Sequence, residues 1–161
     1  MLYFAYGSNL DPRQMSERCP GHGVAGLAAL HDYRLGFPLR SDRWGGGTAG
    51  PLHAHGQTVW GIVYDIGEKD LAALDSHEGC QGPGNPHNLY DRELVTVDLV
   101  RTDDGSVPRR VRAWVYVARV IHPAPPSSRY LETLLRGARH HRLPEDYIEQ
   151  LETIEPMDES A

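Results

Sequence analysis

The chain begins with a short apolar run that stops abruptly at small residues. Leu2-Tyr3-Phe4-Ala5 predicts a buried strand. It is followed by Gly7-Ser8-Asn9, residue types that let a backbone turn sharply. Asp11 before Pro12 is typical of a helix N-cap and first turn. We therefore expect a strand, a loop and a short helix. This geometry gathers backbone N–H groups that suit a carboxylate or oxyanion, although an ordinary tight turn has the same sequence.

A second segment, residues 67–79, has the pattern of a short amphipathic helix that ends in a glutamate. Leu71 and Leu74 mark its apolar face, and Glu78 falls on that face because it lies four residues after Leu74. Burial of a carboxylate raises its pKa, and a glutamate that titrates near neutrality suits a general base. The alternatives are a surface glutamate or one paired with an arginine. Asp75, near the edge of the same face, is the rival candidate.

Together these segments resemble the γ-glutamylcyclotransferase family. The resemblance rests on Tyr6-Gly7-Ser8-Asn9-Leu10 and on Leu74-Asp75-Ser76-His77-Glu78-Gly79. It covers nearly the whole chain, and continues through the segments at 59–64, Tyr90, 125–130, 137–138 and 143–147. The family's fold implies an α+β protein with a mixed, barrel-like sheet and a few flanking helices.

The resemblance implies an enzyme that releases the γ-glutamyl group of a small molecule as 5-oxoproline. The substrate's own α-amine attacks the γ-carbonyl, so neither a protein nucleophile, a metal nor a cofactor is required. Glu78 resembles the general acid/base of the family. The loop of Tyr6, Gly7, Ser8, Asn9 and Leu10 resembles its cradle for the glutamyl group. Tyr90 and Tyr130 match two family tyrosines that would hydrogen-bond the substrate or orient Glu78; core aromatic rings with locally satisfied hydroxyls are the alternative.

The leaving group stays open at this stage. It could be an amino acid, a peptide, glutathione, or an amine in a γ-glutamylamine cyclotransferase or a biosynthetic deprotecting enzyme. A pocket for amines should carry less positive charge around residues 40–56 and 80–89. The Gly- and Pro-rich stretch 80–89 is a candidate lid, and Gly45-Gly46-Gly47 indicates a flexible loop. A reading of another class is a non-catalytic binding protein on the same fold, which Glu78 argues against.

The length, hydrophobic content and net charge of the chain limit the kinds of molecule it is expected to bind. The chain has 161 residues, 40% of them hydrophobic, and a net charge of −6. We expect one domain over 1–156 with a frayed acidic tail at 157–161, and no nucleic-acid or membrane partner. Met1 leads directly into a strand without an export signal, and Cys19 and Cys80 suggest reduced thiols. The expected location is therefore cytoplasmic, and analogy with related proteins suggests a homodimer.

The coarse organisation is mixed α and β. Strands are expected at 2–5, 24–39 (broken), 58–65, 90–101 and 109–120, the last two forming a hairpin around 103–106. Helices are expected at 12–18, 68–78, 127–140 and 144–154, with Ser127 as the N-cap of the third. The histidine pairs at 53/55 and 140/141 lack the partners of a zinc site. His77 with Cys80 lacks a third group for a nucleophilic dyad, and Arg109, Arg110 and Arg112 indicate a charged sheet edge.

Overall fold

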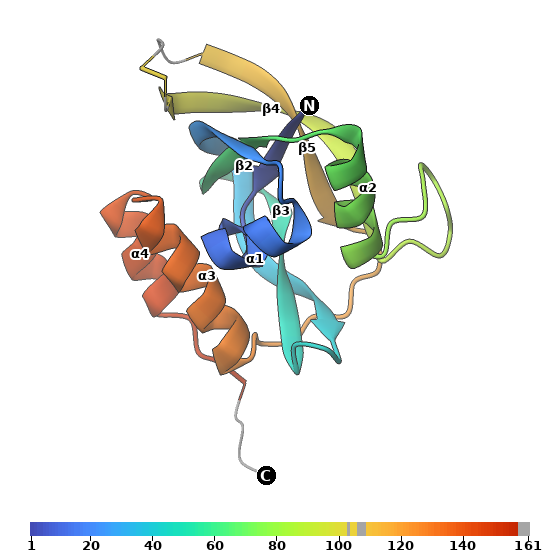
Figure 1. Ribbon diagram of the computed structural model, residues 1–161. Coiled ribbons are helices and arrows are strands. Elements are labelled where there is room, and N and C mark those ends of the chain that lie inside the picture. The colour runs from blue at the N-terminus through green and yellow to red at the C-terminus, as the bar shows by residue number, and fades with distance from the viewer. Residues whose placement is uncertain (103, 106–108, 158–161) are drawn as a thin grey trace.

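The computed structural model describes residues 1–102, 104–105 and 109–157. Its strands close into a barrel in the order β1-β3-β2-β4-β5, with helices packed outside it (Figure 1). The strands are β1 (Leu2–Ala5), β2 (Gly23–Ser41), β3 (Gly46–Asp65), β4 (Tyr90–Thr102) and β5 (Arg109–Ala118). The helices are η1 (Ser8–Leu10, a 3₁₀ turn), α1 (Pro12–Arg18), α2 (Glu68–His77), α3 (Ser128–His140) and α4 (Glu145–Glu152). The predicted α+β barrel is confirmed.

The short strand β1 closes the barrel. It pairs antiparallel with β3, where Ala5 lies opposite Ile62, and parallel with β5, where Tyr3 lies opposite Trp114. Phe4 and Ala5 are fully buried. The apolar N-terminal run is therefore a buried strand, as the sequence predicts, and it carries the Gly7–Asn9 segment to one end of the barrel.

The long hairpin of β2 and β3 corrects two expectations. The strand predicted at 24–39 runs without a break from Gly23 to Ser41, and three register shifts in its pairing with β3 absorb the irregular sequence. The strand predicted at 58–65 starts already at Gly46.

Gly46 and Gly47, expected in a flexible loop, are buried strand residues instead. The connector before α3 crosses directly over them. The N–H of Gly47 donates to the carbonyl of Pro125 at 2.8 Å, and a Cβ at Gly47 would lie 1.9 Å from the carbonyl oxygen of Ala124. Tertiary contact therefore overrides the weak strand preference of glycine.

The hairpin of β4 and β5 matches its prediction except at two strand ends: β4 ends at Thr102 instead of residue 101, and β5 ends at Ala118 instead of residue 120. On β5, Ala113 and Val115 are buried while Arg112 is exposed, so the period of two holds. Tyr116 belongs to the opposite set yet is buried, because its hydroxyl donates to Asp75 of α2 at 2.7 Å. Positions 103 and 106 of the expected turn lie outside the described residues.

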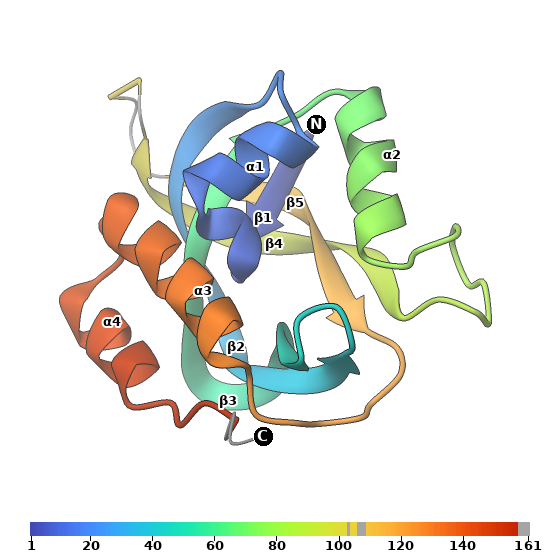
Figure 2. The ribbon, with the colours of Figure 1, turned by 60° about the horizontal axis from the view of Figure 1, so that its bottom comes forward.

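Helix α3 packs against η1 and α4, and α1 contacts η1 and, on its other side, α2 (Figure 2). Ser127 caps α3 as predicted, since its Oγ accepts the N–H of Tyr130 at 3.2 Å. Asp11 takes the N-cap position of α1 but makes no side-chain cap bond; its buried carboxylate pairs with Arg136 of α3 at 3.1 Å. The C-terminal helix is shorter than predicted and ends at Glu152.

The ends of the expected domain stay predictions. Apart from Met157, the proposed acidic tail at 157–161 lies outside the described residues. The N–H of Met157 donates to the carbonyl of Pro126 at 2.7 Å, which places that residue against the connector before α3. Within the described part of the chain, every helix is too short or too polar to cross a membrane.

Gly137 offers a test of the α3–η1 packing. A Cβ at this position would lie 2.2 Å from the carbonyl carbon of Leu10 and 2.4 Å from the nitrogen of Asp11, both backbone atoms. Alanine would gain about 1 kcal/mol of helix propensity, but overpacking costs about 1–3 kcal/mol or more. Because the clash is with backbone, the cost should lie toward the upper end of this range, and we expect Gly137→Ala to lower the free energy of unfolding by a net amount of about 1–2 kcal/mol, measured by chemical denaturation.

Gly23→Ala is the matched control for this prediction. Apart from its chain neighbours, no atom of the described residues lies within 4 Å of a Cβ built at Gly23, so the stability of this variant should change by less than about 0.5 kcal/mol. Equal or higher stability of Gly137→Ala would show that α3 does not need this close approach.

Candidate active site

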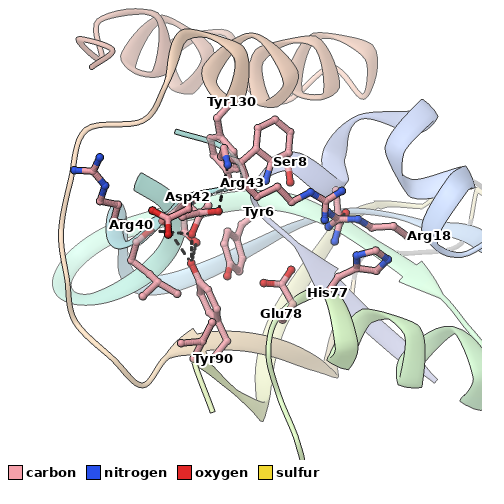
Figure 3. Close-up of a pocket in the computed structure, with 18 of the residues that line it drawn as sticks. Tyr6, Ser8, Arg18, Arg40, Asp42, Arg43, His77, Glu78, Tyr90 and Tyr130 are labelled. Carbon is pink, nitrogen blue, oxygen red and sulfur yellow. Dashed lines mark hydrogen bonds between the residues drawn. The ribbon is translucent and has the colours of Figure 1, made fainter. Parts of the chain in front are cut away.

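A cavity of about 280 Å³ opens where β1 ends, between η1, the end of α2 and the tip of the β2–β3 hairpin (Figure 3). All site residues predicted from the sequence line it except one: Tyr6, Gly7, Ser8, Asn9, Glu78, Tyr90 and Tyr130. The exception is Leu10, which is fully buried in the core. Its side chain therefore supports the loop instead of facing the cavity.

Asn9 holds the loop in place. Its Nδ2 donates to the hydroxyl of Tyr3 at 2.9 Å, and its Oδ1 accepts from Gln14 at 2.9 Å and Arg18 at 3.0 Å. Its backbone carbonyl accepts the hydroxyl of Tyr64 at 2.8 Å. All these groups come from β1, α1 and β3, so the loop is fixed to both the barrel and the first helix.

Gly7 permits a close approach between the loop and α3. A Cβ at Gly7 would lie 2.7 Å from the hydroxyl oxygen of Tyr130. That oxygen also accepts the N–H of Ala49 at 3.0 Å. Burial raises the pKa of Tyr130 to about 12, so its hydroxyl keeps its proton at neutral pH. The neutral phenol therefore sits directly against the backbone of Gly7.

The other two predicted tyrosines contribute mainly their rings. Tyr6 donates its hydroxyl to the carbonyl of Tyr116 at 2.7 Å. Tyr90 donates to the carbonyl of Ala49 at 3.0 Å, and its oxygen lies 2.7 Å from Oγ1 of Thr48. Burial raises the pKa of both. For these two hydroxyls the structure shows local satisfaction by the protein, while both residues line the cavity.

Glu78 follows the last residue of α2, and its N–H donates to the carbonyl of Leu74 at 2.9 Å. Gly79 then turns the chain with φ +64, and the carboxylate enters the cavity (Figure 3). No residue in the described ranges donates a hydrogen bond to it or forms an ion pair with it. Burial raises the pKa of Glu78 to about 7, and Arg18 opposes this rise. The carboxyl group is thus partly ionised at neutral pH and free to exchange a proton.

Asp75, the rival candidate, is engaged elsewhere. One of its oxygens pairs with Arg92 at 2.8 Å, and the other accepts the hydroxyl of Tyr116 at 2.7 Å. It is not among the residues that line the cavity. These two contacts tie the last turn of α2 to β4 and β5, which fixes the position of Glu78.

The mouth of the cavity contains residues that were not predicted as site residues. The tip of the β2–β3 hairpin contributes Arg40, Ser41, Asp42, Arg43 and Trp44, and Arg18 and His77 lie opposite. Arg18 had no sequence signal, because Asn9 lies before the start of α1 at Pro12 and the helical repeat therefore does not relate the two residues. The hairpin tip had none either, because its position depends on the unpredicted length of β2 and β3.

The loop 80–89 is anchored by the buried Asn88. Its Oδ1 accepts the N–H of Gln81 at 2.6 Å, and its Nδ2 donates to the carbonyl of Gly82 at 2.8 Å and to Asp91 at 2.9 Å. Leu89 is the part of this loop that lines the cavity. The loop thus shapes the cavity through one apolar side chain at its end; a role as a lid stays a prediction.

The cysteines and histidines considered in the sequence analysis do not form a second catalytic or metal site among the described residues. Cys19 and Cys80 are buried free thiols, as predicted. His77 is an exposed residue at the cavity mouth, so a dyad with the buried Cys80 is not supported. In the described ranges no group of three or more His, Cys, Asp or Glu side chains gathers as a metal site.

Comparison with known proteins gives consistent matches. The model of the AIG2-like family matches residues 58–151. The γ-glutamylcyclotransferase of Mus musculus is 32% identical over 160 residues, which are 96% of this chain and 79% of that protein. The Homo sapiens protein of the same name is 33% identical over 161 residues, 98% of this chain and 80% of its own.

Solved structures agree. A γ-glutamyl cyclotransferase structure superposes with a TM-score of 0.86 at 32% identity, covering 100% of this chain and 91% of its own. A crystal structure of an uncharacterized Homo sapiens protein gives a TM-score of 0.84 at 32% identity, covering 99% and 90%. The resemblance inferred from the two motifs is thereby confirmed, and the chain belongs to the γ-glutamylcyclotransferase family within the AIG2-like proteins.

Proposed function

We propose that this protein is a γ-glutamylcyclotransferase that converts a γ-glutamyl compound into 5-oxoproline and a free amine-bearing product. The observation that carries this proposal is the unpartnered carboxyl group of Glu78, held in a cavity beside the Gly7–Asn9 loop. Membership of the family supports it, since the relatives carry this activity as their name. A binding protein would have no need of a partly buried acid that has no partner among the described residues, so the non-catalytic alternative is disfavoured.

The first step is proton removal. The α-ammonium of the substrate loses a proton to Glu78, which makes the amine a nucleophile. The amine nitrogen then attacks the γ-carbonyl carbon and closes a five-membered ring. Such well-oriented intramolecular attacks reach effective molarities of about 10⁵–10⁸ M. The cavity has to hold the glutamyl chain bent, and the rings of Tyr6 and Tyr90 supply walls for it.

The second step is collapse of the tetrahedral intermediate. Negative charge on the γ-oxygen is stabilised by backbone N–H groups of the Gly7–Asn9 loop and by the neutral hydroxyl of Tyr130. Loss of one such donor typically lowers rate by about 10²–10³-fold. The bond from the γ-carbon to the departing nitrogen breaks as that nitrogen receives the proton held by Glu78. The ring nitrogen still carries a second hydrogen and a positive charge, and it passes this proton through Glu78 to the freed amine, which leaves as an ammonium. The enzyme returns to its starting state without a protein-bound intermediate.

A second substrate class within the same chemistry is a γ-glutamylamine or a γ-glutamyl-protected biosynthetic intermediate. The arginines at the cavity mouth favour the reading with an anionic leaving group, as argued below. For the surroundings of the enzyme we propose a cytoplasmic location, which the free thiols of Cys19 and Cys80 support. We also propose a homodimer. It is supported by the exposed apolar side chains of Leu89, Val120 and Ile121 on adjoining segments.

Replacement of the base tests the mechanism. Glu78→Gln keeps the size of the side chain but removes the proton acceptor, so 5-oxoproline release should fall by about 10²–10⁴-fold or more. Glu68→Gln makes the same change at the exposed start of the same helix and should retain full activity. Normal turnover by a folded Glu78→Gln variant would show that another group is the base. If Asp75→Asn lost turnover while Glu78→Gln kept it, the base would be Asp75.

The pH profile provides an independent test. Only ionised Glu78 accepts a proton, and burial raises the pKa of Glu78 to about 7. We expect kcat/KM to fall as pH drops through about 7, with a single ionisation on the acid side. The inflection should be absent from the residual activity of Glu78→Gln. A profile flat from pH 8 down to 5 would contradict a glutamate held in this environment.

The same shift has a consequence for stability. The pKa of Glu78 is higher in the folded than in the unfolded chain, so the folded state binds this proton more tightly. Ionisation therefore destabilises the fold, and the destabilisation grows as pH rises from near 4.5 to about 7 and is complete above it. Glu78→Gln should raise the thermal midpoint at pH 8 and change it much less at pH 4.5. Calorimetry at both pH values checks this, and a lower midpoint at pH 8 would contradict it.

A further inference from the structure

The mouth of the cavity is cationic, and its arginines lack carboxylate partners. Arg18 and Arg43 both line the cavity. Neither forms an ion pair within the described part of the chain. Arg18 contacts only a neutral acceptor, Oδ1 of Asn9, at 3.0 Å. Two guanidinium groups at one opening, neither in an ion pair with a described residue, are an arrangement that can bind a carboxylate, because each offers several donors in one plane.

The two arginines converge from opposite sides. Arg18 comes from α1 and Arg43 from the tip of the β2–β3 hairpin. Figure 3 shows their side chains reaching toward one another above His77 and Glu78. Both guanidinium groups also lower the pKa of His77, after the larger effect of its desolvation. The charged form of His77 is therefore disfavoured, and the two arginines supply the positive charge at this point.

The hairpin tip that carries Arg43 is fixed over the cavity. The backbone carbonyl of Arg43 accepts a hydrogen bond from the guanidinium of Arg129, on α3, at 2.6 Å. The same guanidinium lies 4.6 Å above the ring of Trp44, and Trp44 meets the ring of Tyr130 edge-on at 5.0 Å. Arg43 is thus presented by a backbone that is already held in position, which lowers the entropic cost of binding an anion.

The other charged side chains at the cavity mouth do not neutralise the positive charge of Arg18 and Arg43. Asp42 lines the cavity from the same turn, but it is exposed and pairs with neither arginine among the described contacts. Arg40 lines the mouth as well, yet Figure 3 shows its side chain directed away from Glu78. The positive charge that faces the reacting end of the cavity is therefore that of Arg18 and Arg43.

We propose that Arg43, supported by Arg18, is a specificity-determining residue that binds a carboxylate on the departing group of the substrate. This inference rests on the proposed cyclotransferase function. The substrate's α-carboxylate shares a carbon with the amine that Glu78 deprotonates, so it stays in the inner part of the cavity. The departing amine extends toward the mouth, where Arg43 is exposed. The enzyme would thereby select γ-glutamyl amino acids or peptides over γ-glutamyl amines.

A pair of matched substrates tests this proposal. γ-Glutamyl-alanine and γ-glutamyl-alaninamide have the same shape but differ in the charge of the departing group. Wild type should prefer the acid by more than about tenfold in kcat/KM. Arg43→Gln should lose about 10- to 100-fold on the acid, the range for a lost hydrogen bond between charged groups, and stay within about threefold on the amide. Arg43→Lys should keep part of the preference, because it retains the charge without the planar fork.

Arg13→Gln is the control, since Arg13 is exposed on α1 and does not line the cavity. It removes the same charge and should leave both substrates unaffected. Equal kcat/KM of wild type for acid and amide would overturn the role of Arg43 while leaving the cyclotransferase function intact. An equal loss on both substrates in Arg43→Gln would also overturn it, because the contact would then be to the glutamyl half. No 5-oxoproline from either substrate would overturn the proposed function itself.

Discussion

The structure depends on how a strand of four residues closes the barrel. β1 is the seam between β3 and β5, and its partners on β3 are about sixty residues away in the sequence. Because β1 is paired with a strand along both of its edges, the chain leaves it at the end of the barrel. There it enters η1, which α3 covers through the close approach of Gly137. The position of the Gly7–Asn9 loop is thus set by packing on three sides, and the loop's own small residues only make that packing feasible.

The polar contacts around the cavity divide into two groups. The supporting groups are saturated: Asn9 uses both ends of its amide and its carbonyl, and Asp75 uses both carboxylate oxygens. Glu78 differs from both, because it enters the cavity without a hydrogen-bond or ion-pair partner among the residues that the structure describes. A buried acid without a partner is costly. The surrounding saturated network holds it there, and that unfavourable placement is the source of its near-neutral pKa.

The parts of the fold that were predictable from the sequence are those with a local signal. Leu2–Ala5, the helix that precedes Glu78 and the alternation in β5 each follow a period that burial imposes on sequence. The stretch 46–57 has no such signal. Gly46, Gly47 and Pro51 are poor strand formers, and they become strand because β2 and the connector at 124–126 pack against them. The cationic mouth lies at the end of this stretch, so it could not be located without the register of the long hairpin.

The candidate site residues show the same division. Glu78 and the Tyr6–Asn9 loop were identified by motif and face the cavity, whereas Leu10 belongs to the same motif and faces the core. A sequence motif identifies a set of neighbouring residues, but it does not distinguish those that face the cavity from those that support the loop by packing in the core. Only the side-chain directions, set by the 3₁₀ turn of η1, make that distinction.

The way α3 packs on η1 also orders events during synthesis. The loop that lines the cavity is synthesised long before α3, yet the backbone of Leu10 packs against Gly137 and that of Gly7 against Tyr130. Domains assemble as units once their distant partners are available. The N-terminal half can pair its long hairpin early, but the cavity has no complete wall until α3 has emerged and docked. A growing chain therefore carries Glu78 for more than fifty residues of synthesis before that acid is enclosed in a working site.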